Sequence, residues 1–152
     1  ELASQVLESR DTVVDEITSG VGGDSAREAA NDVDQLLKHH ASSASLEQLE
    51  VLAPAVVARE LPVYAWEESE EGPGTVISGI VDLVYRDPDH GRLVVADYKT
   101  DAVDGDAELE ERARVYEPQV RTYARILRDA LNLEEEPHVE LWFLAADRMV
   151  RL

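Results

Sequence analysis

The sequence of 152 residues contains no cysteine. This absence excludes a disulfide framework, a cysteine-ligated zinc site, an iron–sulfur cluster and a cysteine nucleophile. No apolar run approaches the roughly 20 residues of a membrane-spanning helix, and no signal peptide is visible, so we expect a cytoplasmic protein. The only methionine is Met149, and the chain stops inside an alternating apolar run. We therefore expect a domain of a longer protein.

Lysine is almost absent too. Two lysines, Lys38 and Lys99, accompany 12 arginines, and 33 acidic residues give a net charge of −19. Such a charge argues against a simple basic nucleic-acid clamp and against binding to anionic lipid. Many carboxylates with few lysines predict a protein from a salt-rich (halophilic) cytoplasm, because salt screens the repulsion between its negative charges. The alternative is an ordinary acidic protein. Where surface lysine is avoided, a retained lysine is a candidate for function.

Hydrophobic residues make up 44% of the chain, enough for a core, and the length fits a single domain over residues 1–152. Residues 1–55 read as a helical lead-in. Helical spacing of apolar residues predicts one helix over about 1–17, a second over 24–38 and a short third over 46–51 that ends at Pro54. A glycine-rich linker separates the first two.

Residues 56–152 read as a catalytic α/β core, because the pattern changes to a β-like period. Strands are predicted at 56–66, 75–85, 92–100 and 138–145, with a possible last one at 149–152. A long amphipathic helix is predicted at 107–131, bent or divided at Pro118. Strands, a crossover helix and a returning strand imply a mixed central sheet flanked by helices.

Two neighbouring predicted strands carry an aspartate inside an apolar run. Asp82 ends the run GIVD, and Asp97 begins the run DYK. Unpaired buried carboxylates are costly, so such positions are unusual. Alternation along the second strand puts Asp97 and Lys99 on one face and Tyr98 on the other. A short hairpin joins the two strands, so the three charged side chains can converge.

Two carboxylates can hold a hard divalent cation such as Mg²⁺, which polarises a phosphoryl oxygen and activates water. A lysine beside them can orient that water and stabilise charge developing on the phosphate. The alternative for Asp97 and Lys99 is a surface ion pair worth at most about 1 kcal/mol. Asp82 and the strong strand patterns favour a phosphodiester-hydrolysing site.

The motifs GIVD, DYKT and Q-x-x-x-Y, the last formed by Gln119 and Tyr123, occur in an order and spacing that closely resemble the RecB-like nuclease domain. This branch of the PD-(D/E)XK superfamily has a restriction-endonuclease-like fold. It occurs at the carboxyl end of UvrD/Rep-type helicases and in AddAB/RecBCD-type exonucleases. The resemblance covers about residues 56–146, with Glu60-Leu61-Pro62 preceding the three motifs.

The resemblance implies a role for each matching residue. Asp82, Asp97 and the backbone carbonyl of Tyr98 would bind Mg²⁺ or Mn²⁺, and Lys99 would be the catalytic lysine. Gln119 and Tyr123, one helical turn apart, would line the site and contact DNA. Glu60 matches an acidic position and would lie near the metal ligands, although a cap or surface acid is equally expected. Thr100 and Asp101 would shape the following loop.

The sequence departs from the family in one respect. Many members carry a metal-binding histidine on an amino-terminal helix, and residues 3–8 loosely resemble its surroundings without a histidine. His39 and His40 stand in the wrong context, and we expect a solvated pair at a helix end.

Two further features leave alternatives open. Arg114, Arg121, Arg125 and Arg128 share one side of the long predicted helix, where they would either steer the DNA backbone or pair with Glu110, Glu111 and Glu117. Arg121 is included among the site-lining candidates. Trp66 and Trp142 lie in strand patterns, which favours core positions over base-stacking platforms.

The sequence thus predicts a Mg²⁺- or Mn²⁺-dependent DNA nuclease, expected to be the exonuclease module of a helicase–nuclease in DNA repair or recombination. Its partners would be DNA and UvrD/Rep-type helicase domains, in the same parent chain or in a partner subunit, and no membrane. A catalytically decayed DNA-handling or protein-docking module is the main alternative. A stand-alone nuclease such as a resolvase is a weaker one.

Overall fold

The computed structural model describes residues 43–69 and 72–152. The two helices predicted before residue 39, and His39 and His40, lie outside the described residues. The chain divides into two units between Val51 and Leu52, and each is described by itself. Helix α3 (Ala44–Leu52) confirms the third predicted helix. Its first turn is capped by the Ser43 hydroxyl, which accepts a hydrogen bond of 3.2 Å from the N–H of Leu46.

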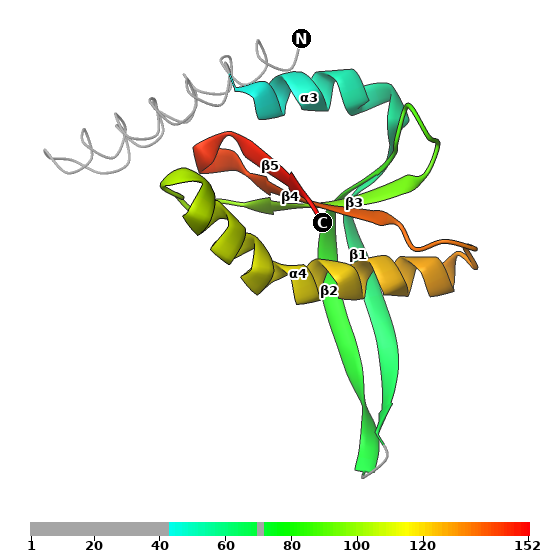
Figure 1. The fold of residues 1–152 in the computed structure, drawn as a ribbon. Coiled ribbons are helices and arrows are strands. Elements are labelled where there is room, and N and C mark those ends of the chain that lie inside the picture. Colours follow the sequence, from blue (N-terminus) through cyan, green and yellow to red (C-terminus); the bar gives the residue numbers. More distant parts are fainter. Residues whose placement is uncertain (1–42, 70–71) are drawn as a thin grey trace, which may run out of the picture. The chain divides into compact units, whose positions relative to one another are not determined.

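The second unit contains one mixed sheet of five strands in the order β1-β2-β3-β4-β5 (Figure 1). The strands are β1 (Val56–Ser69), β2 (Gly72–Arg86), β3 (Leu93–Lys99), β4 (His138–Phe143) and β5 (Arg148–Arg151). β3 and β4 are parallel, and every other neighbouring pair is antiparallel. The predicted mixed sheet is therefore confirmed, and the crossover between β3 and β4 is helix α4 (Gly105–Ala130).

Both ends of α4 are fixed by hydrogen bonds. At the start, Glu108 reaches back and accepts a bond of 2.8 Å from the N–H of Asp104. At the end, Asn132 adopts φ +51°, and the N–H of Leu133 donates to the carbonyl of Arg128 at 2.9 Å. This is the Schellman arrangement that closes a helix. Pro118 lies inside α4 without dividing it, and the helix changes direction part-way along (Figure 1).

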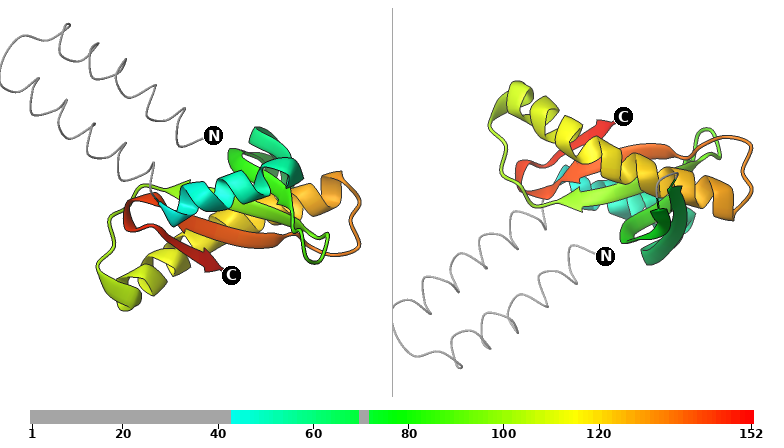
Figure 2. Two further views of the ribbon diagram at one scale, coloured as in Figure 1. Left: turned by 90° about the horizontal axis from the view of Figure 1, so that it is seen from above. Right: turned by 90° about the horizontal axis from the view of Figure 1, so that it is seen from below.

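Helix α4 lies across one face of the sheet, as the two views of Figure 2 show. Its buried residues recur at helical spacing, and they belong to one cluster with apolar side chains of β2, β3 and β4. The helix contributes Leu109, Ala113, Val120, Tyr123, Ala124 and Leu127, and the strands contribute Val81, Val84, Val95, Val139, Leu141 and Phe143. This cluster is the core that holds α4 against the strands. No helix in the described part of the chain is long and apolar enough to cross a membrane.

The far part of the β1–β2 hairpin, residues 62–69 and 72–80, extends beyond the rest of the sheet (Figure 1). β3 pairs with β2 only from Leu83 to Arg86, so this part, which we call the hairpin arm, is a two-stranded ribbon. Trp66 is opposite Val76, and Pro62 is opposite Ile80. Isolated two-stranded ribbons are only marginally stable, so packing of the arm's other face against α4 contributes to its support.

On the sheet face opposite α4, a buried carboxylate joins three strands. Glu140 of β4 is 1% exposed and accepts hydrogen bonds from the Tyr85 hydroxyl (2.8 Å) and from Trp142 Nε1 (3.0 Å). Arg151 of β5 adds a bond of 2.9 Å and an ion pair of 2.7 Å. Burial and the neighbouring Glu140 carboxylate raise the pKa of Tyr85, which keeps its hydroxyl protonated as a donor. The buried charge is thus fully paired.

Removing this carboxylate should destabilise the fold. In Glu140→Ala, the donors of Tyr85 and Trp142 lose their acceptor and Arg151 keeps only Asp87, so we expect the free energy of unfolding to fall by about 3 kcal/mol. Urea denaturation followed by circular dichroism measures this loss. The control is Glu134→Ala, an exposed acid that should change stability by less than about 0.5 kcal/mol. Equal stability of the two variants would contradict a structural role for Glu140.

Candidate functional site

Strand β3 carries the central pair of the site. Its neighbours are β2 and β4. Pairing with β2 ends at Ala96, and pairing with β4 continues to Lys99 and fixes the direction of the side chains. Asp97 and Lys99 alternate with Tyr98, and their parallel partners on β4 are Leu141 and Phe143. Asp97 and Lys99 therefore point to the face that α4 covers, while Tyr98 points to the other face and contacts Trp142.

Asp97 and Lys99 form a close ion pair. Lys99 Nζ lies 2.6 Å from Asp97 Oδ2, and the side chains are 12% and 6% exposed. Burial raises the pKa of Asp97, the lysine opposes this shift, and the Asp82 carboxylate adds to it. An acid enclosed this far is costly unless a cation stays close to it. The pair is thus no exposed surface bridge.

Lys99 also begins a chain of hydrogen bonds that ends on α4. Its Nζ donates to Gln119 Oε1 at 3.2 Å, and Gln119 Nε2 donates to the Tyr123 hydroxyl at 2.9 Å. The structure therefore brings the Q-x-x-x-Y residues to the lysine. Gly79 makes room for the tyrosine, because a Cβ at this position would lie 2.5 Å from Tyr123 Cε1 and would collide with the hydroxyl. Close approach of helix and strand requires glycine here.

Tyr116 also contacts Lys99, although none of the sequence motifs includes it. Lys99 Nζ lies 4.0 Å from the centre of its ring, which is cation–π geometry. The Tyr116 hydroxyl donates to Asp101 at 2.9 Å, and this bond raises the pKa of the tyrosine. Tyr116 lies three residues before Gln119, a spacing that puts both on the same side of a helix and could have identified it.

Asp82 lies beside the pair on β2. The pairing of β2 with β3 ends at Leu83 and Ala96, and Asp82 and Asp97 are the next residues on the two strands. Asp82 Oδ2 accepts a hydrogen bond of 2.7 Å from the backbone N–H of Tyr98. The carboxylate is thus held against the strand that carries Asp97 and Lys99, and the side chain is only partly buried.

Glu60 belongs to the same row of the sheet. The pairs Arg59–Leu83 and Leu61–Val81 flank it, so Glu60 stands opposite Asp82. Its side chain is exposed, and its φ of +48° is in the left-handed region, where residues other than glycine are uncommon. Glu60 makes no hydrogen bond or ion pair with the residues that the structure describes.

Three of the four arginines considered on α4 form ion pairs. Arg114 pairs with Glu110 at 3.4 Å, and Arg121 pairs with Glu117 at 2.6 Å. Arg128 pairs with Asp129 at 2.7 Å. Arg125 differs, because its side chain hydrogen-bonds Thr122 at 3.0 Å and has no carboxylate partner within residues 43–69 and 72–152.

The core prediction for the two tryptophans is right for one and wrong for the other. Trp142 is 1% exposed, whereas Trp66 is 62% exposed. Trp66 stands on the hairpin arm, beyond the point where β3 ends its pairing with β2, so no third strand extends the core to it.

The donor set suits a hard, partly hydrated cation. Among the described residues, no three histidine, aspartate or glutamate side chains cluster closely enough to enclose a metal ion. What the chain offers is two carboxylates from adjacent strands, Asp82 and Asp97, with the backbone carbonyl of Tyr98 next to them. Mg²⁺ is bound by one or two carboxylates and keeps several waters, so these oxygens fit it, while the absence of cysteine leaves no thiolate for a soft metal.

The chain was compared with solved structures, with curated proteins and with family models. The crystal structure of SSO0001 is similar at 16% identity over 99% of this chain and 76% of that chain, with a TM-score of 0.46. No curated protein matches the sequence. The family model described as the PD-(D/E)XK nuclease superfamily matches residues 2–151. Because that match spans nearly the whole sequence, the chain belongs to the PD-(D/E)XK nuclease superfamily.

Proposed function

We propose that the chain is a Mg²⁺- or Mn²⁺-dependent deoxyribonuclease whose site is built on Asp82, Asp97 and Lys99. The observation that carries the proposal is the chain of polar contacts from Asp97 through Lys99 and Gln119 to Tyr123, with Asp82 bonded to the N–H of Tyr98 on the same strand. Superfamily membership supports the reaction class, since these proteins are generally metal-dependent phosphodiesterases. An ion pair serving stability alone would need neither the glutamine nor the Asp82 carboxylate.

Asp82, Asp97 and the carbonyl of Tyr98 would hold the cation. When bound, it supplies Lewis-acid activation of the phosphoryl oxygen and of the attacking water. Lys99 donates hydrogen bonds to the phosphate and stabilises the negative charge that develops there. Gln119 and Tyr116 orient the ammonium group, and Tyr123 positions the glutamine. The Tyr98 N–H keeps one oxygen of Asp82 fixed.

The finer proposal is a RecB-like exonuclease module of a helicase–nuclease that acts in repair or recombination and works beside UvrD/Rep-type helicase domains. It is supported by the three motifs, which the fold gathers around one lysine, and by the glycine of GIVD, against which Tyr123 packs. The acidic composition motivates testing the activity at high salt. A decayed DNA-handling module is the outcome to be distinguished.

The first test is cleavage of labelled linear DNA, single- and double-stranded, with Mg²⁺ or Mn²⁺ at low and molar KCl. We expect metal-dependent cleavage by the wild type and a loss of about 100-fold or more in Lys99→Ala, because one charge-stabilising donor is removed. Lys38→Ala, the other lysine, serves as the control. Closed circular DNA distinguishes the modes, since an exonuclease leaves it intact. Undiminished cleavage by Lys99→Ala would refute the assignment.

Metal binding gives a second test that does not depend on turnover. Titration with Mn²⁺ in a calorimeter should show one site, and Asp82→Asn should weaken it by about tenfold or more, because one of two carboxylate ligands is lost. Asp89→Asn, in the exposed turn between β2 and β3, should bind like the wild type. If the wild type binds no Mn²⁺, the decayed module is the correct interpretation.

The contact between Gly79 and Tyr123 provides a third test. In Gly79→Ala, the new methyl group would displace Tyr123 and with it Gln119. We expect cleavage to fall by about tenfold or more, since small misplacements of positioning residues are costly. Ser78→Ala, an exposed neighbour, should cleave normally. Full activity of a folded Gly79→Ala protein would show that the tyrosine does not position the site.

A further inference from the structure

Asp101 and Tyr116 form a hydrogen-bonded pair next to the site around Lys99. Asp101 follows β3 in the loop that leads to α4, and Tyr116 lies near the middle of that helix. The Tyr116 hydroxyl is 2.9 Å from one carboxylate oxygen of Asp101 and 3.1 Å from the other. The bond therefore ties the loop after β3 to α4, and neither residue is among those expected to bind Mg²⁺.

The ring of Tyr116 contacts two further side chains. Its centre lies 6.5 Å from that of Phe143, a fully buried residue of β4, and the two planes are inclined at 53°. Tilted pairs of this kind are favourable, since the positive edge of one ring approaches the negative face of the other. Lys99 Nζ lies 4.0 Å from the centre of the Tyr116 ring. A loop and two strands thus all act on one aromatic side chain of the helix.

The hydroxyl bond decides how precisely this ring is placed. Tyr116 is only partly buried, so packing alone does not fix its orientation. A cation–π contact requires the cation over the face of the ring and weakens when the ring turns away. Because the Asp101 acceptor is charged, its bond is about twice as strong as one between neutral groups. The bond also raises the pKa of Tyr116, so the phenol stays protonated and remains a donor.

Asp101 is itself oriented by a cation of the same helix. Arg112, one helical turn before Tyr116, lies 3.8 Å from Asp101 Oδ1. The Arg112 and Asp101 side chains are 46% and 24% exposed, so the ion pair contributes little to stability. Both partners of Asp101 belong to α4, which keeps the carboxylate turned toward the helix. The contacts thus run from Arg112 through Asp101 and Tyr116 to Lys99.

An aromatic ring suits this side of the lysine better than an oxygen would. An ammonium group has three donors and no acceptor. Asp97 and Gln119 take two of the donors of Lys99. A third oxygen in the place of the Tyr116 ring would occupy the last one. The face of the ring attracts the cation without offering an oxygen acceptor, so one N–H stays available for a phosphate.

We propose that Asp101 is a positioning residue for Lys99. It fixes the Tyr116 hydroxyl, and the ring of Tyr116 then holds the ammonium group with one donor free for the phosphate. Asp101 acts through Tyr116 and takes no part in the bonds that form and break. The inference rests on the proposed nuclease function and deepens it, because it gives the loop after β3 a part in the reaction.

Nuclear magnetic resonance tests this geometry without turnover, because the chain has only two lysines. In the full chain labelled with ¹³Cε-lysine, the Hε signals of Lys38 and Lys99 are assigned with Lys38→Arg. Protons above an aromatic face are shielded, so we expect the Lys99 signal upfield of the Lys38 signal. This displacement should vanish in Tyr116→Leu, shrink in Asp101→Ala and persist in Asp101→Asn, whose amide oxygen still accepts the hydroxyl. An unchanged Lys99 signal in Asp101→Ala would overturn the proposal.

Cleavage of linear DNA tests the consequence for the reaction. We expect kcat to fall about tenfold in Tyr116→Leu with KM little changed, because the lysine loses its cation–π contact and its position. Asp101→Ala should lower kcat about fivefold in the wild-type background. In the Tyr116→Phe background it should have no further effect, because no hydroxyl is left to hold. Independent, additive losses would show that Asp101 does not act through Tyr116, which contradicts the proposal.

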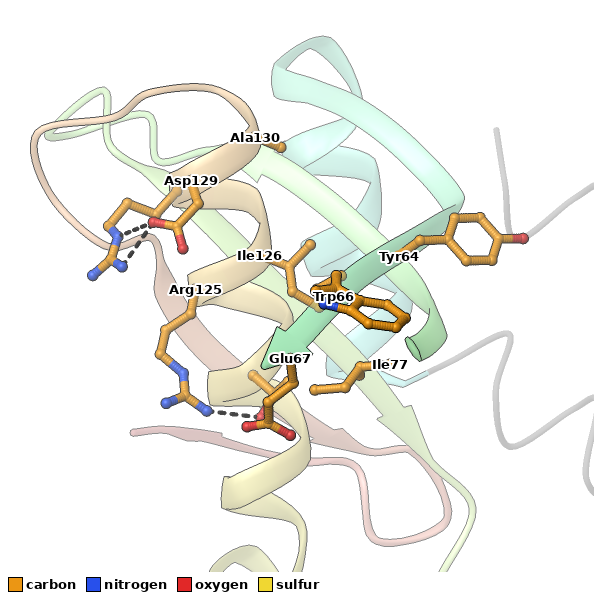
Figure 3. A pocket seen from close by; sticks show the side chains of 11 residues that line it. Tyr64, Trp66, Glu67, Ile77, Arg125, Ile126, Asp129 and Ala130 are labelled. Atoms are coloured by element: carbon orange, nitrogen blue, oxygen red, sulfur yellow. Dashed lines mark hydrogen bonds and ion pairs between the residues drawn. The ribbon is translucent and has the colours of Figure 1, made fainter. Parts of the chain in front are cut away.

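The control is another aspartate that pairs with an arginine of α4. Asp129 Oδ1 lies 2.7 Å from Arg128 Nη2 near the end of the helix. It lines a pocket of about 550 Å³ between the hairpin arm and the second half of α4, and no residue of the site around Lys99 lines that pocket (Figure 3). Asp129→Ala removes the same charge as Asp101→Ala, and it should leave the Lys99 signal and kcat unchanged. Equal losses in the two variants would attribute the effect to charge alone and would overturn the proposal.

The two measurements separate this proposal from the one on which it rests. If the wild type cleaves no DNA at any salt, the nuclease proposal is wrong, and the Lys99 signal still decides whether Asp101 holds the ring. If the wild type cleaves and Asp101→Ala keeps its full kcat, the nuclease stands and the positioning proposal is wrong. A reduced displacement of the signal together with a lowered kcat supports both.

Discussion

The ion pair between Asp97 and Lys99 is the interaction on which the site depends. A carboxylate in the middle of a five-stranded sheet has little access to water, and the lysine two residues along the strand compensates for the desolvation. The remaining contacts of Lys99 follow from this position. Gln119 and Tyr116 of α4 meet the ammonium group because α4 covers the same face of β3. Packing of α4 against the sheet is therefore also what assembles the polar site.

Much of this arrangement could be predicted from the sequence. Apolar runs interrupted by aspartate identified β2 and β3, and a helical stripe identified α4, because these patterns depend on local period and burial. Alternation correctly separated Tyr98 from Asp97 and Lys99. The hydrogen bond from the Tyr98 N–H to Asp82 could not be foreseen, because it depends on how two strands diverge where their pairing ends.

Other features lay beyond the sequence because they depend on what packs nearby. Trp66 has the pattern of a core residue, yet the sheet narrows to two strands before it is reached. Tyr116 reads as apolar until Lys99 is placed over its ring. In each case a neighbour distant in sequence decides the role.

The run GIVD combines two requirements in one strand. Gly79 of this run lets Tyr123 of α4 approach, and Asp82 accepts the hydrogen bond from the N–H of Tyr98. The three-residue spacing on β2 therefore fixes how far the helix contact lies from the Asp82 carboxylate. A larger residue at 79 demands a smaller one at 123, and related chains should therefore show these two positions varying together while the distance between 79 and 82 stays constant. The site would then evolve by paired substitutions, one on β2 and one on α4, rather than by single substitutions.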